Sequence, residues 1–469
     1  MLGKIVNFTS DALYSYVLII LLVLGGIYFT VRTRFVQFRL LGQQLKAVTE
    51  RNDKKGVSSF QALMVSTASR VGTGNIIGVA TALCVGGFGS VFWMWLIAII
   101  GAASAFVEST LAQIYKKRGK DGCYGGPAYY IEAATKKKSL AVVFSVFLIL
   151  TYGFGFNMLA SYNLQSTFSS YSFYNESYTP WIIGLIIAVL VGYCLIGGGK
   201  RIISVTSLLV PVMGALYILV AIVLSFINVK MIPDVFREIF AGAFDFKAIF
   251  GGFSGSCVMF GIKRGLFSNE AGVGSAPNAS ASAEISHPAK QGLVQVLSVF
   301  LDTLLVCSAT AFMCMTSGVT PPGSSAEAAT YVQDALSVTL GKAGPVFITV
   351  AMMLFAFTTL LGNLFYVDKS INYLYGKEPS RRIRNIYYVI ASAVILVGAG
   401  LSADLLWGIA DITMGLMALI NMPVIIYLGK YAVRALGDYE RRVKNKERMT
   451  FNVKDIGLPH NTDYWNEDA

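Results

Sequence analysis

Apolar runs of about 20 residues recur along almost the whole chain, and they limit what the chain can fold into. A helix of about 20 apolar residues crosses the hydrocarbon core of a bilayer. Lipid offers no partner for a backbone N–H or C=O, so each run is expected to be a helix and the chain an all-α membrane protein. We count eleven such segments, at roughly 13–31, 60–84, 90–115, 140–168, 181–197, 204–227, 247–281, 291–317, 344–370, 385–402 and 404–429.

Composition excludes a sizeable soluble domain. The chain is 55% hydrophobic and 14% charged, whereas soluble domains carry about 25% charged residues. The stretch before the first segment has no basic region or cleavage pattern, so we expect a retained helix rather than a signal peptide. Five of the six cysteines lie in apolar segments and none forms a Cys-x-x-Cys pair, which favours packing roles over disulfides or a metal site.

The Lys and Arg residues predict the orientation in the membrane. If the N-terminus lies outside, the inside connections and the tail hold 29 of the 38 Lys and Arg, and the outside connections hold five. Cytoplasmic loops are enriched in these residues. We therefore expect a multi-pass protein of the cell membrane with its N-terminus outside and its C-terminus in the cytoplasm. The net charge of +12 is explained in this way without a nucleic-acid partner.

The second segment contains a cluster that disfavours a continuous helix. Gly72, Thr73, Gly74 and Asn75 lie in its middle. Glycine costs about 1 kcal/mol relative to alanine in a helix interior, and Thr and Asn can cap a new helix. An unwound stretch would leave N–H groups that suit a carboxylate. Close helix packing is the alternative interpretation of the glycines, but it does not explain the neighbouring polar side chains.

The seventh segment is also interrupted. Seven glycines lie between residues 251 and 277, together with Lys263, Arg264 and Glu270. Charges at membrane depth are expected to face a cavity or to pair with one another. We predict an internal pair of Glu270 with Lys263 or Arg264, with a structural role as plausible as one in transport.

The two interruptions lie five segments apart, in corresponding positions of two halves of the chain. This arrangement is typical of transporters built from inverted repeats, which bind their substrate at the bilayer midplane. The first segment then precedes a five-plus-five core as an extra helix. The predicted division is an N-terminal helix with its basic connector, a first five-helix repeat, a second five-helix repeat and a cytoplasmic tail, at residues 1–58, 59–227, 228–430 and 431–469. We expect the tail to be a solvated helix end followed by a flexible terminus.

Three motifs resemble one known family. The stretches 71–80 (VGTGNIIGVA), 265–279 (GLFSNEAGVGSAPNA) and 125–131 (GGPAYYI) are similar to signatures of the alanine or glycine:cation symporters, and the resemblance covers about residues 10–430. It implies a LeuT-type fold and symport of small neutral amino acids, usually with sodium.

The resemblance also implies a cation site between the first and eighth core helices. On this chain the ligands would be the backbone carbonyls of Ala68 and Val71 and the hydroxyls of Thr358 and Thr359. Hydroxyl and carbonyl oxygens are ligands that a small cation prefers. Taken without the resemblance, two helical threonines are more often bonded back to their own helix.

The substrate site implied by the resemblance uses both interruptions. The substrate carboxylate would face the backbone of Thr73, Gly74 and Asn75. The amino group of the substrate would face unwound carbonyls near Phe260, Gly261 and Ile262.

The sequence departs from the family at two positions. Many members carry a tryptophan where this chain has Asn363, and many carry a glutamine motif where residues 157–163 read NMLASYN. If these side chains line the pocket, it is more polar or roomier on that side. We therefore expect serine and glutamine to be candidate substrates beside alanine and glycine.

The alternatives to sodium-coupled symport are proton-coupled transport, an ion channel and an enzyme. Coupling to protons would use intramembrane acids such as Glu108, Asp302 and Asp368, for which packing or pairing roles are equally plausible. An ion channel is disfavoured because nothing resembles a selectivity filter. An enzyme is disfavoured because the only histidines, His287 and His460, lie outside the apolar segments and no nucleophile–base pair is evident.

Overall fold

The computed structural model describes residues 2–50, 56–119, 122–245, 249, 252, 256–376, 379–459 and 462–465. Gly251, Phe253, Ser254 and Gly255 of the seventh apolar segment lie outside these ranges, as does His460. In the described part the regular elements are helices, apart from one antiparallel hairpin of two short strands.

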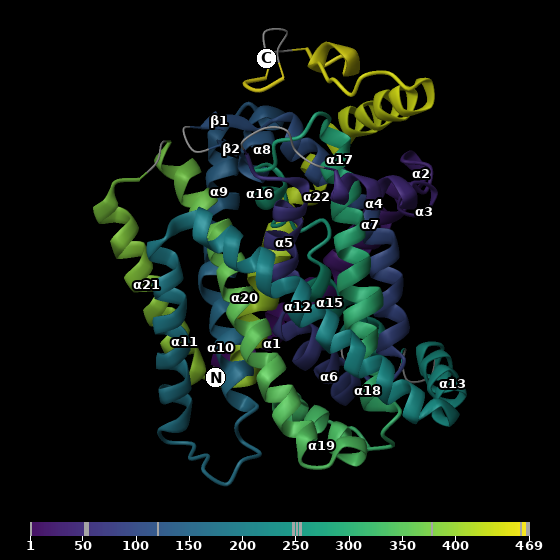
Figure 1. Cartoon of the computed structure of the whole chain (residues 1–469), viewed down its shortest axis with the longest axis vertical. Helices are drawn as coiled ribbons and strands as arrows, with labels where there is room; N and C mark the ends of the chain where they lie inside the picture. Colours follow the sequence, from purple (N-terminus) through teal and green to yellow (C-terminus); the bar gives the residue numbers. More distant parts are fainter. Residues whose placement is uncertain are drawn as a thin grey trace.

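The elements alternate long helices with short π- or 3₁₀-helical turns, which carry the prefix η (Figure 1). Up to residue 231 they are α1 (Leu2–Leu13), η1 (Tyr14–Leu18), α2 (Ile19–Arg32), α3 (Val36–Arg39), α4 (Leu41–Thr49), α5 (Ser59–Arg70), η2 (Gly74–Gly78), α6 (Val79–Thr81), η3 (Ala82–Gly86), α7 (Ser90–Ile114), β1 (Lys117–Gly119), β2 (Gly122–Tyr124), α8 (Pro127–Thr135), α9 (Lys138–Leu148), η4 (Ile149–Gly155), α10 (Phe156–Ser166), α11 (Thr179–Ile196), α12 (Gly198–Ile227) and η5 (Val229–Met231). The later ones are α13 (Ile232–Ala243), α15 (Cys257–Asn269), α16 (Pro277–Ser280), α17 (Pro288–Val299), η7 (Phe300–Cys307), α18 (Ser308–Met315), η8 (Ser325–Glu327), α19 (Ala328–Leu340), α20 (Ala343–Tyr375), α21 (Arg381–Ala399), α22 (Ala403–Asn445) and η9 (Val453–Ile456).

The described helices support a multi-pass membrane protein. Nine of them are long and apolar enough to cross a bilayer, or ten if the bent pair Ser59–Arg70 and Gly74–Gly86 counts as one span. The predicted segment 247–281 contains α15 and α16, with 13 and 4 residues, and both are shorter than a span. The predicted count of eleven spans is therefore not confirmed.

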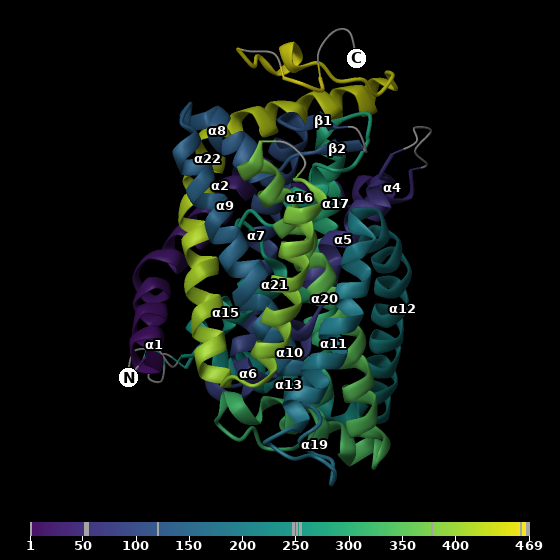
Figure 2. The same cartoon turned by 90° about the vertical axis from the view of Figure 1, so that its left-hand side faces the viewer.

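The exposed sides of α11 and α12 are apolar, as expected for helices that face lipid (Figure 2). Val189 and Ile196 on α11 are 61% and 74% exposed, and Leu208 and Phe226 on α12 are 68% and 73% exposed. A water-soluble monomer rarely exposes so much contiguous apolar surface. These faces therefore fit the hydrocarbon core of a bilayer.

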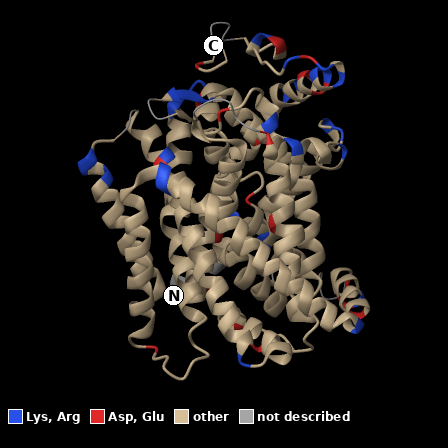
Figure 3. Ribbon diagram, in the orientation of Figure 1, with Lys and Arg blue, Asp and Glu red and all other residues tan. Residues whose placement is uncertain are grey.

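Basic side chains gather at one end of the molecule (Figure 3). We call this end the basic face; it includes the exposed residues Arg118, Lys137, Arg381 and Arg441, and the C-terminus lies beside it. The other end, the opposite face, carries α13 and α19, and α1 begins on that side (Figure 2). The predicted orientation, with the basic face in the cytoplasm, stays a prediction.

Broken helices lie at the centre of the bundle, and paired helices from the two halves surround them (Figure 1). α5 begins with a capping box between Ser58 and Gln61, and the two halves of its span meet at a bend of 49°. α7 packs against α17 and α15, while α11 packs against α21, and α5 packs against both α12 and α20. The boundaries of the two predicted repeats, near residues 227 and 430, stay predictions.

The predicted flexible tail is wrong for the described residues. α22 continues to Asn445, and the chain then folds back over the basic face. Trp465 Nε1 donates to the Gln113 carbonyl at 2.7 Å, and Lys116 Nζ lies 3.9 Å from the centre of the Tyr464 ring. Aromatic residues near the end of the chain anchor it, a contact that composition does not reveal.

Candidate functional site

The first predicted break is present where α5 ends. Val71 leaves the helical conformation, with φ −76° and ψ 86°. The Gly72 amide donates to Asn75 Oδ1 at 2.8 Å and not to the carbonyl of Ala68, four residues earlier. Among the described residues, no hydrogen bond reaches the carbonyl of Ala68 or of Val71. The break therefore leaves two backbone oxygens free at the end of α5.

The next helical turn, η2, begins on the other side of the break. Thr73 and Gly74 are buried, and within the described part of the chain neither of their amides donates to a protein acceptor. The hydroxyl of Thr73 accepts a bond from Asn163 Nδ2 at 3.3 Å. Free amides at the start of a helical turn form a natural site for a carboxylate.

A buried hydroxyl without a partner faces the break from α20. Thr359 is 5% exposed, and its Oγ1 has no hydrogen-bond partner among the described residues. A Cβ added at Gly72 would overlap this Oγ1 and lie 3.0 Å from the Thr359 Cβ. The glycine thus lets the threonine approach the unwound backbone. Thr358 is different, because its hydroxyl donates within the helix, to Leu354 and Phe355.

The chemistry of this arrangement suits a small cation. Among the described residues, three oxygens have no hydrogen-bond partner, the carbonyls of Ala68 and Val71 and the hydroxyl of Thr359, and they belong to two helices in contact at Gly72. Leaving such groups buried and unpaired is costly unless a ligand completes them. The three atoms that would bind the cation are all neutral oxygens, the kind of ligand that alkali cations prefer.

The second break lies further along the chain than predicted. Phe260, Gly261 and Ile262 belong to the body of α15, so the unwound carbonyls expected there are absent and this prediction is wrong. Gly261 packs tightly on α7, and no side chain would fit there. The helix ends at Asn269, and Glu270 follows with a left-handed φ of 54°. Glycines at 272 and 274, with φ of 82° and 89°, continue the irregular stretch up to α16.

Two polar connections join the two breaks. Ser69 Oγ lies 2.9 Å from Glu270 Oε1. Asn75 Nδ2 donates to Asp302 Oδ1 at 2.7 Å, and Ser268 Oγ donates to Asp302 Oδ2 at the same distance. Asp302 is thus a bridge between the break in α5 and the end of α15, which explains its presence in an apolar segment.

Asn363 faces polar side chains on α5 and α10. Its Oδ1 lies 2.7 Å from Ser69 Oγ, and its Nδ2 donates to Asn157 Oδ1 at 2.9 Å. Both ends of the amide therefore have protein partners. The adjacent α10 still carries buried polar atoms without described partners, namely Asn157 Nδ2, Ser161 Oγ and Asn163 Oδ1. The asparagine and serine side chains at these positions are therefore buried, and Asn163 contacts the break directly through Thr73.

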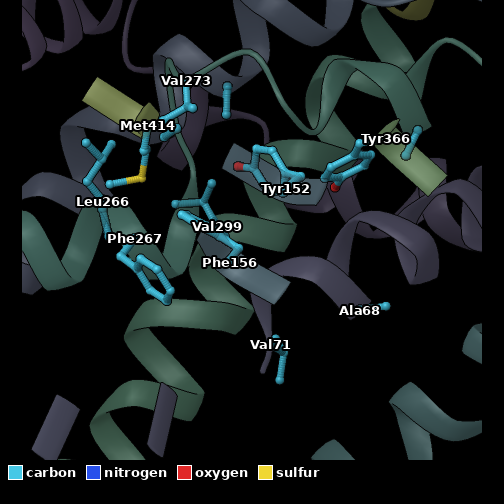
Figure 4. Packing of buried hydrophobic residues seen from close by; sticks show 14 of the residues in the cluster. Ala68, Val71, Tyr152, Phe156, Leu266, Phe267, Val273, Val299, Tyr366 and Met414 are labelled. Carbon is cyan, nitrogen blue, oxygen red and sulfur yellow. The ribbon is translucent and has the colours of Figure 1, made fainter. Parts of the chain in front are cut away.

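Three aromatic rings, on α10, α15 and α22, pack together beside the break. The ring centres of Phe156 and Phe267 are 4.3 Å apart, and those of Phe267 and Trp407 are 4.8 Å apart. Figure 4 shows Phe156 beside Phe267, with Val71 of the break below them. A Cβ added at Gly74 would come within 2.8 Å of the Phe267 ring. Phe267 therefore packs against the start of η2.

A cavity of about 190 Å³ adjoins this aromatic cluster at Trp407. Its wall includes Phe260, Arg264, Trp407 and Asp411, and at its rim the exposed Asp404 accepts a bond from Ser325. The cavity therefore reaches the opposite face. Asp411 was not selected from the sequence, although the rule that points to acids in apolar segments applies to it equally.

The predicted pairing of Glu270 with a neighbouring cation is wrong. Arg264 Nη2 binds Asp411 Oδ2 of α22 at 2.6 Å, and Lys263 Nζ binds Asp11 Oδ1 of α1 at 2.9 Å. Both partners are distant in sequence, so the pairing depends on how the helices pack. Glu270 instead accepts from hydroxyl groups.

Comparison with known proteins decides the family. Residues 1–453 match the sodium:alanine symporter family. This chain belongs to that family. The predicted resemblance is thereby confirmed, and the family and its relatives are transporters rather than enzymes.

Similar transporters cover nearly the whole chain. AlsT, an amino-acid carrier protein of Bacillus subtilis (strain 168), is 40% identical over 467 residues, which are 99% of this chain and 98% of AlsT. GlnT, a probable sodium/glutamine symporter of the same strain, is 42% identical over 98% of this chain and 95% of its own length. AgcS, a sodium/alanine symporter of Methanococcus maripaludis, is 34% identical over 95% of this chain and 99% of its own length.

The solved structure of MhsT in complex with L-phenylalanine shares the fold. The TM-score is 0.55 at 15% sequence identity, with 82% of this chain and 93% of MhsT covered. This similarity supports the expected LeuT-type architecture of the family member described here. It carries no information on the substrate of this chain.

Proposed function

We propose that this protein is a secondary symporter that imports small neutral amino acids together with sodium by alternating access. The observation that carries the proposal is the unpartnered Thr359 hydroxyl, which faces free backbone oxygens across Gly72. The ion would bind to Ala68, Val71 and Thr359, with Thr358 as a further ligand once its bonds within α20 are loosened.

The substrate carboxylate would bind the free amides of Thr73 and Gly74. These lie at the start of a helical turn, where the helix dipole also favours an anion. The Asn75 side chain accepts a bond from the Gly72 amide and so fixes the backbone that leads into these amides. Sodium at the end of α5 and a carboxylate at the start of η2 would then lie on the same short stretch, so that each favours binding of the other.

The substrate ammonium would face the end of α15. There the carbonyls of Phe267, Ser268 and Asn269 accept no backbone hydrogen bond among the described residues. This revises the predicted position near Phe260 by about two helical turns. The Phe267 ring already contacts Gly74, so both charged ends of an amino acid could be bound across this contact.

The proposed substrate range depends on the buried polar side chains of α10 and of Asn363 on α20. Alanine and glycine are the expected substrates, and the free polar atoms near Asn163 favour serine and glutamine in addition. GlnT, with 42% identity, bears glutamine in its name. Protons are the alternative coupling ion, since two relatives are named sodium/proton-dependent alanine carriers.

Alternating access would use the two breaks as hinges. With the basic face in the cytoplasm, the cavity beside Trp407 would open to the outside, and its lining includes no residue of the break. Release would require the contacts of Ser69 with Glu270 and of Arg70 with Gln295 to open on the basic side.

Uptake of labelled alanine into proteoliposomes, with an imposed sodium or proton gradient, tests the proposal. Thr359→Ala should raise the sodium concentration for half-maximal uptake by about 5- to 150-fold, since losing one ligand of a buried ion costs roughly 1–3 kcal/mol. The matched control is Thr206→Ala, which removes another buried hydroxyl that bonds back within α12.

Three results would contradict parts of the proposal. Uptake driven by a proton gradient without sodium would show that protons, and not sodium, are the coupling ion. Unchanged sodium dependence in Thr359→Ala would refute the ion site. No gradient-driven uptake of any amino acid would refute symport itself. Competition by unlabelled serine and glutamine tests the predicted range.

A further inference from the structure

The connector between α2 and α5 exposes large apolar side chains near the basic face. It contains α3 and α4, which lie beside α17 toward the end of the bundle where the C-terminus is found (Figure 1). Four of its large apolar side chains are between 47% and 54% exposed, namely Phe35, Phe38, Leu41 and Leu45. A cluster of exposed apolar groups marks a contact with a membrane or with another protein.

The chain turns sharply where it leaves α2, and hydrogen bonds fix the turn. Arg34 and Phe35 have left-handed φ angles of 54° and 57°, which residues other than glycine seldom adopt. Arg39 Nε donates to the Arg34 carbonyl at 3.0 Å, and Gln44 Nε2 donates to the Val36 carbonyl at 3.2 Å. The connector is therefore a preformed surface and not a loose loop.

The other side of the connector is buried in the bundle. α3 packs against α7 and α17, and α4 packs against α17 and α5. The side chains that make these contacts are at most 2% exposed, namely Val36, Gln37, Gln44 and Ala47. One side of the connector thus anchors it to the protein, and the apolar groups on the exposed side are left for another apolar medium.

The exposed apolar surface continues the lipid-facing side of α2. Ile27 and Val31, in the last turns of α2, are 45% and 60% exposed and lie directly before the turn. The lipid around α2 therefore also reaches the connector. This continuity favours a membrane lipid over a protein partner as the occupant of the surface.

Basic side chains flank the apolar surface. Arg32, Arg34 and Lys46 are exposed, and none of them forms an ion pair with a described residue. Arg39 differs, because it pairs with Glu440 of α22 at 2.6 Å. Unpaired cations beside exposed apolar groups complement both the charged headgroup and the acyl chains of an anionic lipid.

We propose that the exposed side of α3 and α4 binds anionic phospholipids of the leaflet at the basic face. The acyl chains pack on the four apolar side chains, and the negatively charged headgroup binds Arg34 and Lys46. A zwitterionic phospholipid supplies the same acyl chains without net charge. Anionic lipid therefore binds more tightly.

Lipid bound to the connector also affects the elements around the two breaks. Lys290 Nζ, at the start of α17, binds Glu50 at the end of α4 at 2.6 Å. The ring centre of Phe38 lies 6.0 Å from that of Phe300 on η7. The same η7 carries Asp302, which joins the two breaks. Uptake should therefore increase with the anionic lipid content of the membrane, an effect that rests on the proposed symport.

Thermal unfolding of the purified full-length protein in detergent, with added dioleoyl phosphatidylglycerol or dioleoyl phosphatidylcholine, tests the proposal. The anionic lipid should raise the melting temperature of the wild type at a lower concentration than the zwitterionic lipid, because a ligand of the folded state stabilises it. Each basic residue near an anionic surface contributes about fivefold to binding. Arg34→Gln/Lys46→Gln should therefore need about 25-fold more phosphatidylglycerol for the same shift.

The matched control for this double variant removes two lysines from the opposite face. Lys230→Gln/Lys342→Gln changes the net charge by the same amount, and both side chains are exposed. This control should respond to phosphatidylglycerol as the wild type does.

A second variant keeps the charges and changes the apolar contact. Leu45→Ser removes a large apolar side chain from the surface, so it should raise the phosphatidylglycerol concentration required by about fivefold. Leu185→Ser on the lipid-facing side of α11 is its control, because both leucines are 53% exposed. The control should respond as the wild type does.

The outcomes separate this lipid surface from the symport. Equal responses to the two lipids, or an Arg34→Gln/Lys46→Gln protein that responds as the wild type does, would overturn the lipid surface and leave the symport intact. A selective response that both connector variants weaken, without gradient-driven uptake of any amino acid, would support the lipid surface and refute the symport. Selective binding, together with alanine uptake that increases with the phosphatidylglycerol content of proteoliposomes, supports both.

Discussion

Replacing Gly72 with alanine tests the close contact on which the proposed ion site depends. The added Cβ would overlap the Thr359 hydroxyl oxygen and lie 3.0 and 3.3 Å from the Thr359 Cβ and Cγ2. All three distances are shorter than ordinary carbon contacts, and α20 must move away from the break or Thr359 must rotate. Alanine also favours a continuous helix over glycine by up to about 1 kcal/mol. A continuous helix would draw the free carbonyl oxygens of Ala68 and Val71 into hydrogen bonds. Movement of α20 or rotation of Thr359 would separate the Thr359 hydroxyl from these oxygens.

The expected magnitude follows from the cost of overpacking. Forcing one extra methyl group into a packed interior costs about 1–3 kcal/mol. If this strain is expressed in ion binding, sodium affinity falls by about 5- to 150-fold, at about 1.4 kcal/mol per tenfold. The assay is alanine uptake into proteoliposomes as a function of external sodium, with thermal unfolding of the purified variant measured in parallel.

Two further variants assign the effect to its cause. Gly214→Ala in α12 is the matched control, since no atom lies within 4 Å of its added Cβ, and it should behave as the wild type. The double variant Gly72→Ala/Thr359→Ala removes the overlapping oxygen, so thermal stability should recover while sodium affinity stays weak. A Gly72→Ala protein with the sodium dependence of the wild type would refute the reasoning.

Two other predictions concern the polar bridge and the folded tail. Asn75→Ala leaves the Gly72 amide and Asp302 Oδ1 without a partner, so the unfolding free energy should fall by about 2 kcal/mol or more. Thermal unfolding measures this change, and an unchanged melting temperature would contradict the bridge. Burial lowers the pKa of His287 below its ordinary value of about 6.5, against the opposing effect of Asp438. The unfolded chain then binds the proton more readily, so stability is full above about pH 6.5 and decreases as the pH falls through that value. Limited proteolysis of the tail between pH 7.5 and 5 should show this loss, and His287→Gln should abolish it.

The two breaks differ in how far the sequence located them. In α5 the helix-breaking and capping residues are adjacent, so Gly72 and Asn75 define the interruption locally. In the later segment glycines are spread from 251 to 274, and periodicity does not distinguish a glycine that packs against a neighbouring helix from one that adopts a left-handed conformation. Gly261 is of the first kind and Gly272 of the second. The unwound backbone predicted at Phe260, Gly261 and Ile262 was misplaced for this reason.

The partners of the buried charged side chains could not be predicted from neighbouring residues in the sequence either. Lys263 and Arg264 are adjacent in sequence, yet their partners come from α1 and α22, about 250 and 150 positions away. Glu270, the nearest acid along the chain, points to hydroxyl groups instead. The partner of a buried charge is set by which helices meet around it, and that depends on packing of the whole bundle.

By itself the sequence determined that this chain is a multi-pass helical membrane protein of a transporter family with a broken helix at Gly72. Hydrophobic length, glycine content and capping residues act over a few helical turns and can be read locally. Only the tertiary structure decided that the Thr359 hydroxyl lies beside the break with no hydrogen-bond partner among the described residues, that Asp302 joins the two interruptions, and that Arg264 and Asp411 share a cavity. These features depend on contacts between residues tens to hundreds of positions apart, where burial leaves specific donors and acceptors unpaired.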